Sequence, residues 1–325
     1  MLRYIIRRLL FSIPVLLVAS VGVYAVVRWA VDPLAAFGKN PRLSPKDIAG
    51  IREAMGLNQS GVHQYLTWLS HFVRFNWGTS IVSQQPVWPD IRTALFNSAI
   101  LGLTGVALSL VIGVAIGVYS SIRQYSAFDN IATTTAFVGI SIPNFWFALM
   151  LQLIFGVYLT RWFHLGHAFL PVAGMISPGA DHIAIVDLAR HLILPVTVLA
   201  VQIVAVYSRY MRASMLEVLH SDYLRTARAK GLRERRVIFR HAMRNALIPV
   251  TTQLAIDIGT IAAGLIITEQ IFSWPGMGPY FIDAIQNGDT AQVLPWMMIT
   301  VFSVIVFNLI ADLSYAILDP RIHYA

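Results

Sequence analysis

The sequence predicts an all-α membrane protein with six transmembrane helices, and three observations support this. Of its 325 residues, 57% are hydrophobic and only 12% are charged, whereas about a quarter are charged in an ordinary soluble domain. The hydrophobic residues come in blocks that contain at most one Asp, Glu, Lys or Arg. Each block can cross about 30 Å of hydrocarbon as a helix and is far longer than a membrane β-strand of about 10 residues. The six blocks are 9–27, 93–122, 130–160, 191–208, 245–268 (broken by Asp257) and 290–311.

The first block predicts a retained transmembrane helix, which we assign to residues 1–30. Arg3, Arg7 and Arg8 precede it, as basic residues precede the apolar part of a signal peptide. The run has 19 uncharged residues, against about 7–15 in a cleavable signal, and no clear small-x-small cleavage site ends it. Cysteine is absent, which excludes disulfides, thiolate metal sites and thioether-linked haem.

Residues 31–92 predict an external helical segment. Ser44 has the signature of a helix N-cap, because Pro45 and Asp47 follow it at favourable positions, and Gly56 is placed to end that helix. Aromatic residues then recur at Tyr65, Trp68, Phe72, Trp77 and Trp88. They favour anchoring at the outer membrane interface, and a docking surface for an external partner is the alternative.

Residues 93–325 predict the transmembrane core, with helices two to six. Pro143 and Pro195 are expected to kink or begin the third and fourth spans of the chain. Small residues at every fourth position let helix backbones approach closely, and two blocks have this pattern: Ser109, Gly113 and Gly117, then Ala255, Gly259 and Ala263. Packing within the chain is the plainer interpretation, above all for the first set, and contact between subunits is the other.

A short basic helix is predicted over residues 222–231, within a cytoplasmic segment 213–245 that joins spans four and five. Asp222 is expected to cap it, because a carboxylate accepts hydrogen bonds from the first turn and is favoured by the helix dipole. Gly231 suits the left-handed residue that ends a helix. A second helix begins near Glu234, with apolar i, i+4 pairs on one side and arginines on the rest. These are the pairs Ile238/Ala242 and Phe239/Met243 and the arginines Arg235, Arg236, Arg240 and Arg244.

Most of the net charge lies in this cytoplasmic region. Residues 209–244 hold ten Lys or Arg against three acids, which is a net +7 of the chain's +8. Retention of positive residues in the cytoplasm and attraction to anionic lipid each account for part of the excess. Nucleic-acid binding is not expected, because no aromatic interleaving or binding fold accompanies the charge. The distribution of Lys and Arg around the six spans places both termini in the cytoplasm.

The residues around the basic helix resemble a known family. Ala227 and Gly231, inside Arg-Thr-Ala-Arg-Ala-Lys-Gly, resemble the cytoplasmic EAA loop of ABC importer permeases. The sequences of residues 222–232 and of 240–249, Arg-His-Ala-Met-Arg-Asn-Ala-Leu-Ile-Pro, are similar to those of the dipeptide/oligopeptide/nickel branch. Further similarities are Ser141-Ile-Pro-Asn-Phe-Trp146, the run from Glu269 to Gly278 and the run from Asp312 to Arg321; Leu2–Leu10 and Asn76-Trp-Gly-Thr-Ser80 resemble the first permease subunit of that branch.

Two departures from the general motif accompany this resemblance. Arg225 stands where the general motif has Glu, and the Ile-x-Leu-Pro tail is absent at its usual spacing, where Met243 and Arg244 fall. Pro249 lies further along, as in the peptide branch. The departures therefore favour membership of the peptide branch and do not argue against the family.

The resemblance implies a type I ABC importer permease fold, with a long outer segment after helix 1 and a cytoplasmic coupling helix between helices 4 and 5. It implies a multi-pass protein of the bacterial inner membrane that translocates peptides, or another small solute such as nickel or haem, by alternating access. The implied partners are a second homologous permease, two ABC ATPases, an extracytoplasmic substrate-binding protein and membrane lipid. ATPase coupling is implied for Asp222, Tyr223, Arg225, Thr226, Ala227, Arg228, Ala229, Lys230 and Gly231.

Within that coupling helix the resemblance implies separate roles. Ala227 allows close approach and Gly231 sets the turn, while Arg225, Arg228 and Lys230 offer charge to the ATPase groove. ATP hydrolysis is expected from the partner subunits, because the chain has no Gly-x-x-x-x-Gly-Lys-Ser/Thr phosphate loop.

No catalytic, metal or cofactor site is predicted in the chain itself, and we expect it not to be an enzyme. Metalloprotease and nucleophile-elbow motifs are absent as well. His164, His167, His182 and His191 match no metal-ligand spacing.

Asp257 is the one acid expected near the middle of the bilayer. A carboxylate there is costly unless it faces a cavity or a partner. Lining of the substrate path is therefore the hypothesis, with helix–helix hydrogen bonding and protonation in a packed interface as alternatives. A rival function, an ion-coupled secondary transporter that uses Asp257, requires no ATPase and depends on protons or sodium. Glu269 and Asp312 fall nearer the span ends and are expected to meet headgroups or neighbouring loops.

Overall fold

The computed structural model describes residues 2–34, 44–179 and 184–318, and these are almost wholly helical. His182 and residues 319–321, which the sequence analysis singled out, lie outside the described ranges. The elements are α1 (Leu2–Ala30), α3 (Pro45–Ala54), α4 (Gly61–Val73), α5 (Val87–Ile122), α6 (Ala127–Ser141), α7 (Asn144–Leu153), the π-helical segment η1 (Ile154–Tyr158), α8 (Leu159–Trp162), α9 (Ile185–Leu219), α10 (Asp222–Ala229), α11 (Glu234–Arg236), the π-helical segment η2 (Val237–Ala242), α12 (Met243–Ala246), α13 (Ile248–Ile261), α14 (Ile266–Ile271), α15 (Met277–Gln286) and α16 (Thr290–Leu318).

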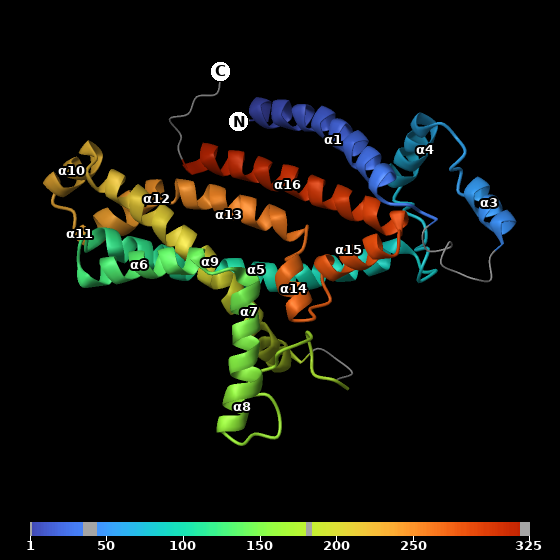
Figure 1. Cartoon of the computed structure of the whole chain (residues 1–325). Coiled ribbons are helices and arrows are strands. Elements are labelled where there is room, and N and C mark those ends of the chain that lie inside the picture. Colours follow the sequence, from blue (N-terminus) through green and yellow to red (C-terminus); the bar gives the residue numbers. More distant parts are fainter. Residues whose placement is uncertain (1, 35–43, 180–183, 319–325) are drawn as a thin grey trace.

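The long helices lie side by side in layers. In Figure 1, α1 lies over α16, α16 over α13, and α13 over α5, α6 and α9. The short helices α10 and α11 lie at one end of this bundle, and α3, α4 and α15 lie at the other.

Five helical stretches are long and apolar enough to cross a membrane: Ile6–Ala30, Val87–Ile122, Asn144–Trp162, Ile185–Leu219 and Thr290–Ser314. The remaining predicted span corresponds to α13, which has 14 residues. Such a helix is about 21 Å long, shorter than the roughly 30 Å of a hydrocarbon core. The structure therefore supports five of the six predicted spans by length and composition.

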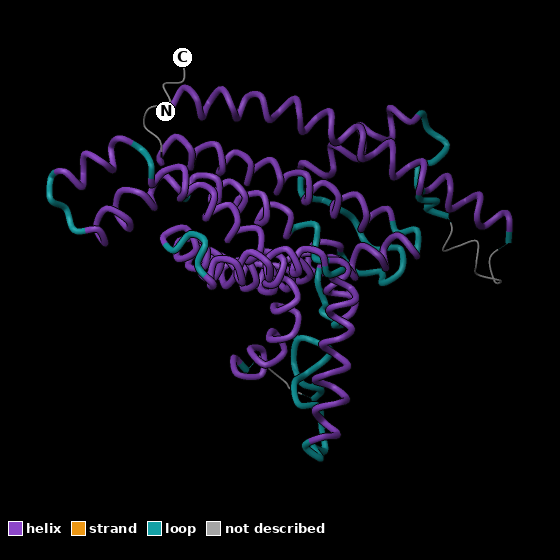
Figure 2. The backbone as a smooth tube through the Cα atoms, turned by 60° about the vertical axis from the view of Figure 1, so that its left-hand side comes forward, coloured by secondary structure: helices purple, strands orange, loops and turns teal. Residues whose placement is uncertain are grey.

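The third predicted span is broken rather than continuous. α6 ends at Ser141 and α7 begins after Pro143, because proline has no N–H to continue a helical hydrogen-bond ladder. Gln202 of α9 donates from Nε2 to the carbonyl of Ile142 at 3.0 Å, which satisfies one acceptor at the break. From this point α7, η1 and α8 project away from the layered helices (Figures 1 and 2). Pro195, by contrast, lies inside α9.

Both small-residue faces pack within the chain. A Cβ at Gly113 would lie 2.7 Å from the Cβ of Tyr207, and one at Gly117 would lie 2.6 Å from the Cβ of Met211, so α5 and α9 meet at these glycines. A Cβ at Gly259 would lie 3.1 Å from the Cβ of Phe307 in α16. The interpretation as intramolecular packing is confirmed at these three positions.

In the segment before α5, α4 packs against α1, whereas α3 has no buried residue. The predicted cap of α3 is confirmed, since the Asp47 amide donates to Ser44 Oγ and the Ser44 amide donates to Asp47 Oδ2. Aromatic residues of α1, α4, the loop after α4 and α5 form a continuous row with neighbouring ring centroids 5.0–5.5 Å apart, in the order Tyr65, Tyr24, Trp68, Phe72, Trp77 and Trp88. This row ties α4 to α1 and to the start of α5, a role that neither sequence interpretation of the aromatic residues included.

Two buried carboxylates fix the loops around α14, α15 and α16. Glu269 accepts from Ser98 Oγ at 2.6 Å and from the Gly278 amide at 2.7 Å. Asp289 accepts from Ser80 Oγ at 2.6 Å. Glu269 is fully buried, so it does not meet the membrane surface, and its carboxylate bonds to α5 and to the first turn of α15.

Candidate functional site

One side of the basic helix α10 packs against the other helices of the chain. Leu224 is fully buried and Ala227 is 8% exposed. Both belong to a hydrophobic cluster that also contains residues of α5, α9, η2, α12 and α13: Val118, Tyr207, Met211, Met215, Val237, Ile238, Ala242, Ala246 and Val250. α10 thus shares one hydrophobic cluster with α9 and with the helices that lead into α13.

Ala227 faces this seat rather than the surface. The expectation that its small side chain allows close approach applies, in this structure, to the approach of α10 to the rest of the chain. A larger side chain would separate α10 from η2 and α9, because protein interiors are close-packed. The side of α10 that is open to a partner does not include Ala227.

The two ends of α10 differ from each other in how well the sequence predicted them. The N-cap residue is Ser221, not Asp222, and its Oγ donates to the Val218 carbonyl at 2.6 Å instead of capping the helix. The assignment of Asp222 as the cap was wrong by one residue; its carboxylate still lies in the first turn, where the helix dipole favours negative charge. Gly231 follows the C-cap Lys230 with φ +76°, which confirms the predicted left-handed residue.

Arg228 is engaged by Glu234, across the turn that follows α10. Arg228 donates from Nη2 to Glu234 Oε1 at 2.9 Å and from Nε to Oε2 at 3.2 Å. These bonds hold the pKa of the Glu234 carboxyl below its usual value and raise the pKa of Arg228. The pair fastens the end of α10 to the start of α11. The charge of Arg228 is thus partly neutralised within the chain, whereas no ion pair with a described residue is formed by Lys230.

The remaining residues of α10 are divided between its two sides. Tyr223 is half-buried, and its hydroxyl accepts a hydrogen bond from Asn245 Nδ2 of α12 at 2.8 Å. Five exposed residues, Asp222, Arg225, Thr226, Ala229 and Lys230, lie at the i, i+3, i+4, i+7 and i+8 positions of one helical face. We name these five the outward face of α10. It combines two basic residues and one acidic residue with Thr226 and, near its end, the small Ala229.

An ion pair that the sequence analysis missed joins α9, near its C-terminal end, to the start of α6. Arg212 donates from Nε to Asp129 Oδ1 at 2.6 Å and from Nη2 to Oδ2 at 2.7 Å, and the Tyr125 amide also donates to Oδ2 at 2.9 Å. Asp129 is 1% exposed, and these hydrogen bonds hold the pKa of its carboxyl below the usual value. The bidentate pair joins the α5–α6 turn to α9, near the start of the segment that carries α10.

Asp257 of α13 has donors from its own chain on both oxygens. Tyr207 of α9 donates its hydroxyl to Oδ2 at 2.6 Å, and Gln253 donates from Nε2 to Oδ1 at 2.8 Å. The carboxylate thus links α9 to α13, which is the hydrogen-bonding role that the sequence left as an alternative. Its side chain is partly exposed.

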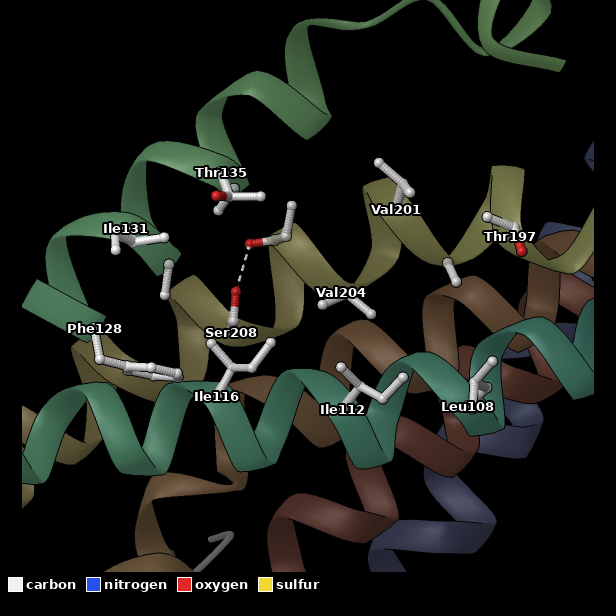
Figure 3. Close-up of a pocket in the computed structure, with 14 residues that line it drawn as sticks. Leu108, Ile112, Ile116, Phe128, Ile131, Thr135, Thr197, Val201, Val204 and Ser208 are labelled. Atoms are coloured by element: carbon white, nitrogen blue, oxygen red, sulfur yellow. Dashed lines mark hydrogen bonds between the residues drawn. The ribbon is translucent and has the colours of Figure 1, made fainter. Parts of the chain in front are cut away.

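A pocket of about 530 Å³ lies between α5, α6 and α9 (Figure 3). Four alanines contribute to the space: Ala132, Ala136, Ala200 and Ala205. The hydroxyl groups of Thr197 and Ser208, which also line it, donate to carbonyls of their own helix. No Asp, Glu, Lys or Arg is among the described residues that line this pocket, so it offers no charged partner to the ends of a peptide.

The residues that the sequence analysis missed are mostly long-range partners. Ser126 and Asp129 have a capping pattern, since Ser126 Oγ accepts from the Asp129 amide, but nothing local indicated Arg212. Gln202 and Gln253 were detectable as polar residues inside apolar blocks. Within residues 2–34, 44–179 and 184–318, no group of three or more His, Asp or Glu side chains is placed to hold a metal ion.

Comparison with known proteins covers the whole chain. Residues 109–324 match the family described as binding-protein-dependent transport system inner membrane component, and residues 1–95 match the N-terminal model of such membrane components. The chain is 41% identical to the oligopeptide transport system permease protein AppB of Bacillus subtilis, over 100% of both proteins. It is 35% identical to the di/tripeptide transport system permease protein DppB of Pseudomonas aeruginosa and 34% identical to the dipeptide transport system permease protein DppB of Escherichia coli, over 100% of this chain and 99% of each relative.

Proposed function

The chain belongs to the binding-protein-dependent transport system inner membrane components, among the peptide ABC permeases, and from that premise we propose that it forms one half of the pore of an ATP-driven peptide importer. Its substrates are dipeptides or oligopeptides, delivered by an extracytoplasmic binding protein. A second, homologous permease completes the pore. Two ABC ATPase subunits hydrolyse the ATP.

The observation that carries this proposal is the two-sided construction of α10. Leu224 and Ala227 bury one side in the chain's own core, while the outward face of α10 stays exposed. A helix that is rigidly seated on one side and free on the other suits the transmission of force. We propose that the outward face fits a groove on an ATPase subunit.

The transport mechanism that we propose is alternating access. Closure of the ATPases on ATP pulls α10, and α9 and α13 move with it because they share its hydrophobic cluster. The pore then opens outward to receive substrate, and hydrolysis resets it inward. Interfaces between packed helices have discrete arrangements, so a small displacement at α10 produces a change between two states.

We propose that both termini lie in the cytoplasm with α10. An ion pair supports this orientation, since Arg8 Nη2, near the start of α1, lies 2.5 Å from Asp312 Oδ2, near the end of α16. The two terminal helices therefore run side by side with their free ends at the same end of the bundle. Arg8 and α10 then carry positive charge on one side of the membrane, as cytoplasmic residues do.

Charge reversal on the outward face of α10 tests the proposed function. We expect Arg225→Glu with Lys230→Glu to release the ATPase subunits from the tagged chain during purification in mild detergent, because both charges face the proposed groove. Arg74→Glu with Arg161→Glu, which changes the same charge at two exposed sites elsewhere, is expected to retain them. Mass spectrometry of the co-purified proteins gives the measurement.

Two outcomes of that purification count against the importer. In one, the unsubstituted chain is recovered alone or as a homo-oligomer, in spectra deep enough to detect partners. In the other, the Arg225/Lys230 variant keeps its ATPases as fully as the Arg74/Arg161 variant. Uptake that depends on a proton or sodium gradient, without ATPases, then favours the secondary transporter that uses Asp257.

Asp257→Asn and Tyr207→Phe together test the role of Asp257. We propose that Asp257 lines the substrate path. If it does, Asp257→Asn raises the KM for uptake, and Tyr207→Phe does not. A purely structural link between α9 and α13 predicts a loss of stability of about 1 kcal/mol in Tyr207→Phe, which removes the donor to Asp257. It predicts a smaller loss in Asp257→Asn, because the amide oxygen still accepts a hydrogen bond. Uptake by Asp257→Asn that equals that of the wild type removes the path role.

A further inference from the structure

The pocket between α5, α6 and α9 runs along these helices (Figure 3). On α9 its lining extends from Thr197 to Ser208, a distance of about 16 Å at 1.5 Å per residue. On α5 it extends from Leu108 to Ile116, in the half of the apolar block 93–122 that leads to the α5–α6 turn. One leaflet supplies about half of the roughly 30 Å of hydrocarbon in a bilayer. The pocket is therefore about as long as one leaflet is deep.

The pocket is too narrow for a helix. Its volume of about 530 Å³, divided by that length, gives a mean cross-section of about 33 Å². An α-helix with its side chains is about 10 Å across, which corresponds to about 80 Å². A helix of another subunit therefore does not fit inside the pocket, whereas a single extended hydrocarbon chain does.

The pocket has a buried floor and an exposed rim. Ala136 and Ala205 on the floor are 6% and 3% exposed. Ile112 of α5 and Ile131 of α6 on the rim are 39% and 66% exposed. Apolar surface that is open at the depth of the hydrocarbon core is as compatible with lipid tails as with other side chains. An acyl chain can therefore enter from the side, between α5 and α6.

Aromatic residues mark one end of the pocket as the level of the membrane surface. Phe128 lines this end, and Tyr119 packs edge to face on it with ring centroids 4.7 Å apart. Tyr125, in the α5–α6 turn, is exposed. Tyrosines gather where a membrane helix meets the lipid headgroups, so a lipid whose tail lies in the pocket has its headgroup at this turn.

The same end carries an excess of positive charge. Within two helical turns of it, the chain has three arginines and one acid: Arg123, Arg209, Arg212 and Asp129. Asp129 is bound by Arg212. Arg123 is exposed and forms no ion pair with a described residue. Because arginine binds phosphate through charge-assisted hydrogen bonds, this end is matched in charge to a phospholipid headgroup.

We propose that the pocket holds one acyl chain of a phospholipid, whose phosphate lies at the α5–α6 turn beside Arg123. The lipid belongs to the cytoplasmic leaflet, since this end of α9 leads to α10, which the proposed orientation places in the cytoplasm. Only the choice of leaflet rests on that orientation, because the site itself follows from the shape and charge of the pocket. The bound chain fills the space between α6 and the α5–α9 pair.

The test uses the intact complex, purified through this chain and placed in nanodiscs of phosphatidylglycerol. A small fraction of this lipid carries a diazirine at the end of one acyl chain. After irradiation, mass spectrometry compares adducts at Leu108 and Thr197, at the end of the pocket away from the turn, with adducts in residues 9–18 of α1, which are mostly exposed and report the bulk lipid. We expect the ratio to be at least fivefold, because each methylene held in an apolar site adds to the affinity.

Substitutions in the pocket make this result specific. Ala132→Phe fills the space and is expected to reduce the adducts to the level of α1. Ala107→Phe, at an exposed alanine of α5 outside the pocket, is the matched control and is expected to change nothing. If Ala132→Phe does not insert, Thr135→Phe blocks the same space from an exposed lining position.

The headgroup is tested by Arg123→Gln, which is expected to lower the ratio at least twofold through loss of a charge-assisted hydrogen bond. Arg235→Gln, also exposed and on the same side, is its control. Equal effects of these two variants overturn the placement of the phosphate.

Two outcomes overturn the site itself. In one, the wild type is labelled in the pocket no more than in α1, as it is when a partner subunit covers the opening. In the other, Ala132→Phe and Ala107→Phe lose adducts equally. The ATPases take no part in this measurement, so a complex recovered without them counts against the proposed function while the adducts still decide the lipid site.

Discussion

Replacement of Gly231 by valine is expected to lower peptide uptake at least tenfold while the chain still inserts and the ATPases still hydrolyse ATP. Gly231 has φ +76°, a conformation that costs an ordinary L-residue about 1–2 kcal/mol, and more for a β-branched one. No atom lies where the new Cβ would be, so the effect is conformational and not steric. The chain relieves the strain by changing the turn, which tilts α10 in the groove that we propose.

Two further substitutions make this result specific. Gly231→Asn is expected to retain most uptake, because asparagine adopts the left-handed conformation more readily than other side chains. Gly166→Val adds the same side chain at a glycine with open space and no positive φ, and is expected to transport normally. The measurement is uptake of labelled peptide into proteoliposomes together with ATP hydrolysis. Normal uptake by Gly231→Val would count heavily against the coupling role of this turn.

Arg212→Met is expected to lower the free energy of unfolding by about 3 kcal/mol. The substitution leaves the carboxylate of Asp129, which is 1% exposed, without its bidentate partner, and an unpaired buried charge costs about 3–5 kcal/mol. We take the lower end because the Arg212 side chain is 26% exposed. SDS-induced unfolding in mixed micelles gives the measurement. Arg123→Met, at an exposed position, is the control and is expected to change little.

A second substitution distinguishes loss of the pair from loss of a side chain. Combining Arg212→Met with Asp129→Leu removes both charges, and we expect the double variant to be more stable than Arg212→Met alone, because a buried pair replaced by apolar groups is often nearly neutral. A double variant that is less stable than either single variant contradicts this account of the pair.

The pH dependence of the same pair follows from the pKa of Asp129. Hydrogen bonds from Arg212 hold that pKa below its usual value in the folded protein, so the pair's stabilisation is fully present above the usual carboxyl pKa of about 3.9. It is lost as pH falls through the lowered value of the folded state. In Arg212→Met, burial without that partner raises the pKa of Asp129, so protonation relieves the cost in the variant at a higher pH. The difference in stability between wild type and Arg212→Met is therefore expected to be largest near neutral pH and to begin narrowing above about pH 4 as the pH falls.

The sequence predicted the features that depend on local pattern. Uncharged blocks located five stretches long enough to span the membrane, and the glycine after a run of helix formers located the end of α10. The cap of α3 was predicted because both of its partners lie within four residues. Each of these depends on residues that are neighbours in the chain.

The missed features depend on residues that are distant in the chain. Asp129 and Arg212 are 83 positions apart, and Gln202 reaches a carbonyl 60 positions away, so no local pattern joins them. The break at Pro143 was ambiguous because one proline can kink a helix or end it. The burial of Ala227 within the chain was not predicted, because residue type alone does not say which face of a short helix is buried.

The most direct test of the central claim is a cross-link from the outward face of α10. The chain contains no cysteine, so Thr226→Cys provides a single site for a thiol-attached photo-cross-linker in the intact complex, and Ser70→Cys, exposed in α4, provides the control. We predict an adduct between Thr226→Cys and an ATPase subunit, identified by mass spectrometry, and none from Ser70→Cys. A complex that hydrolyses ATP but gives no ATPase adduct from Thr226→Cys would contradict the coupling role of α10.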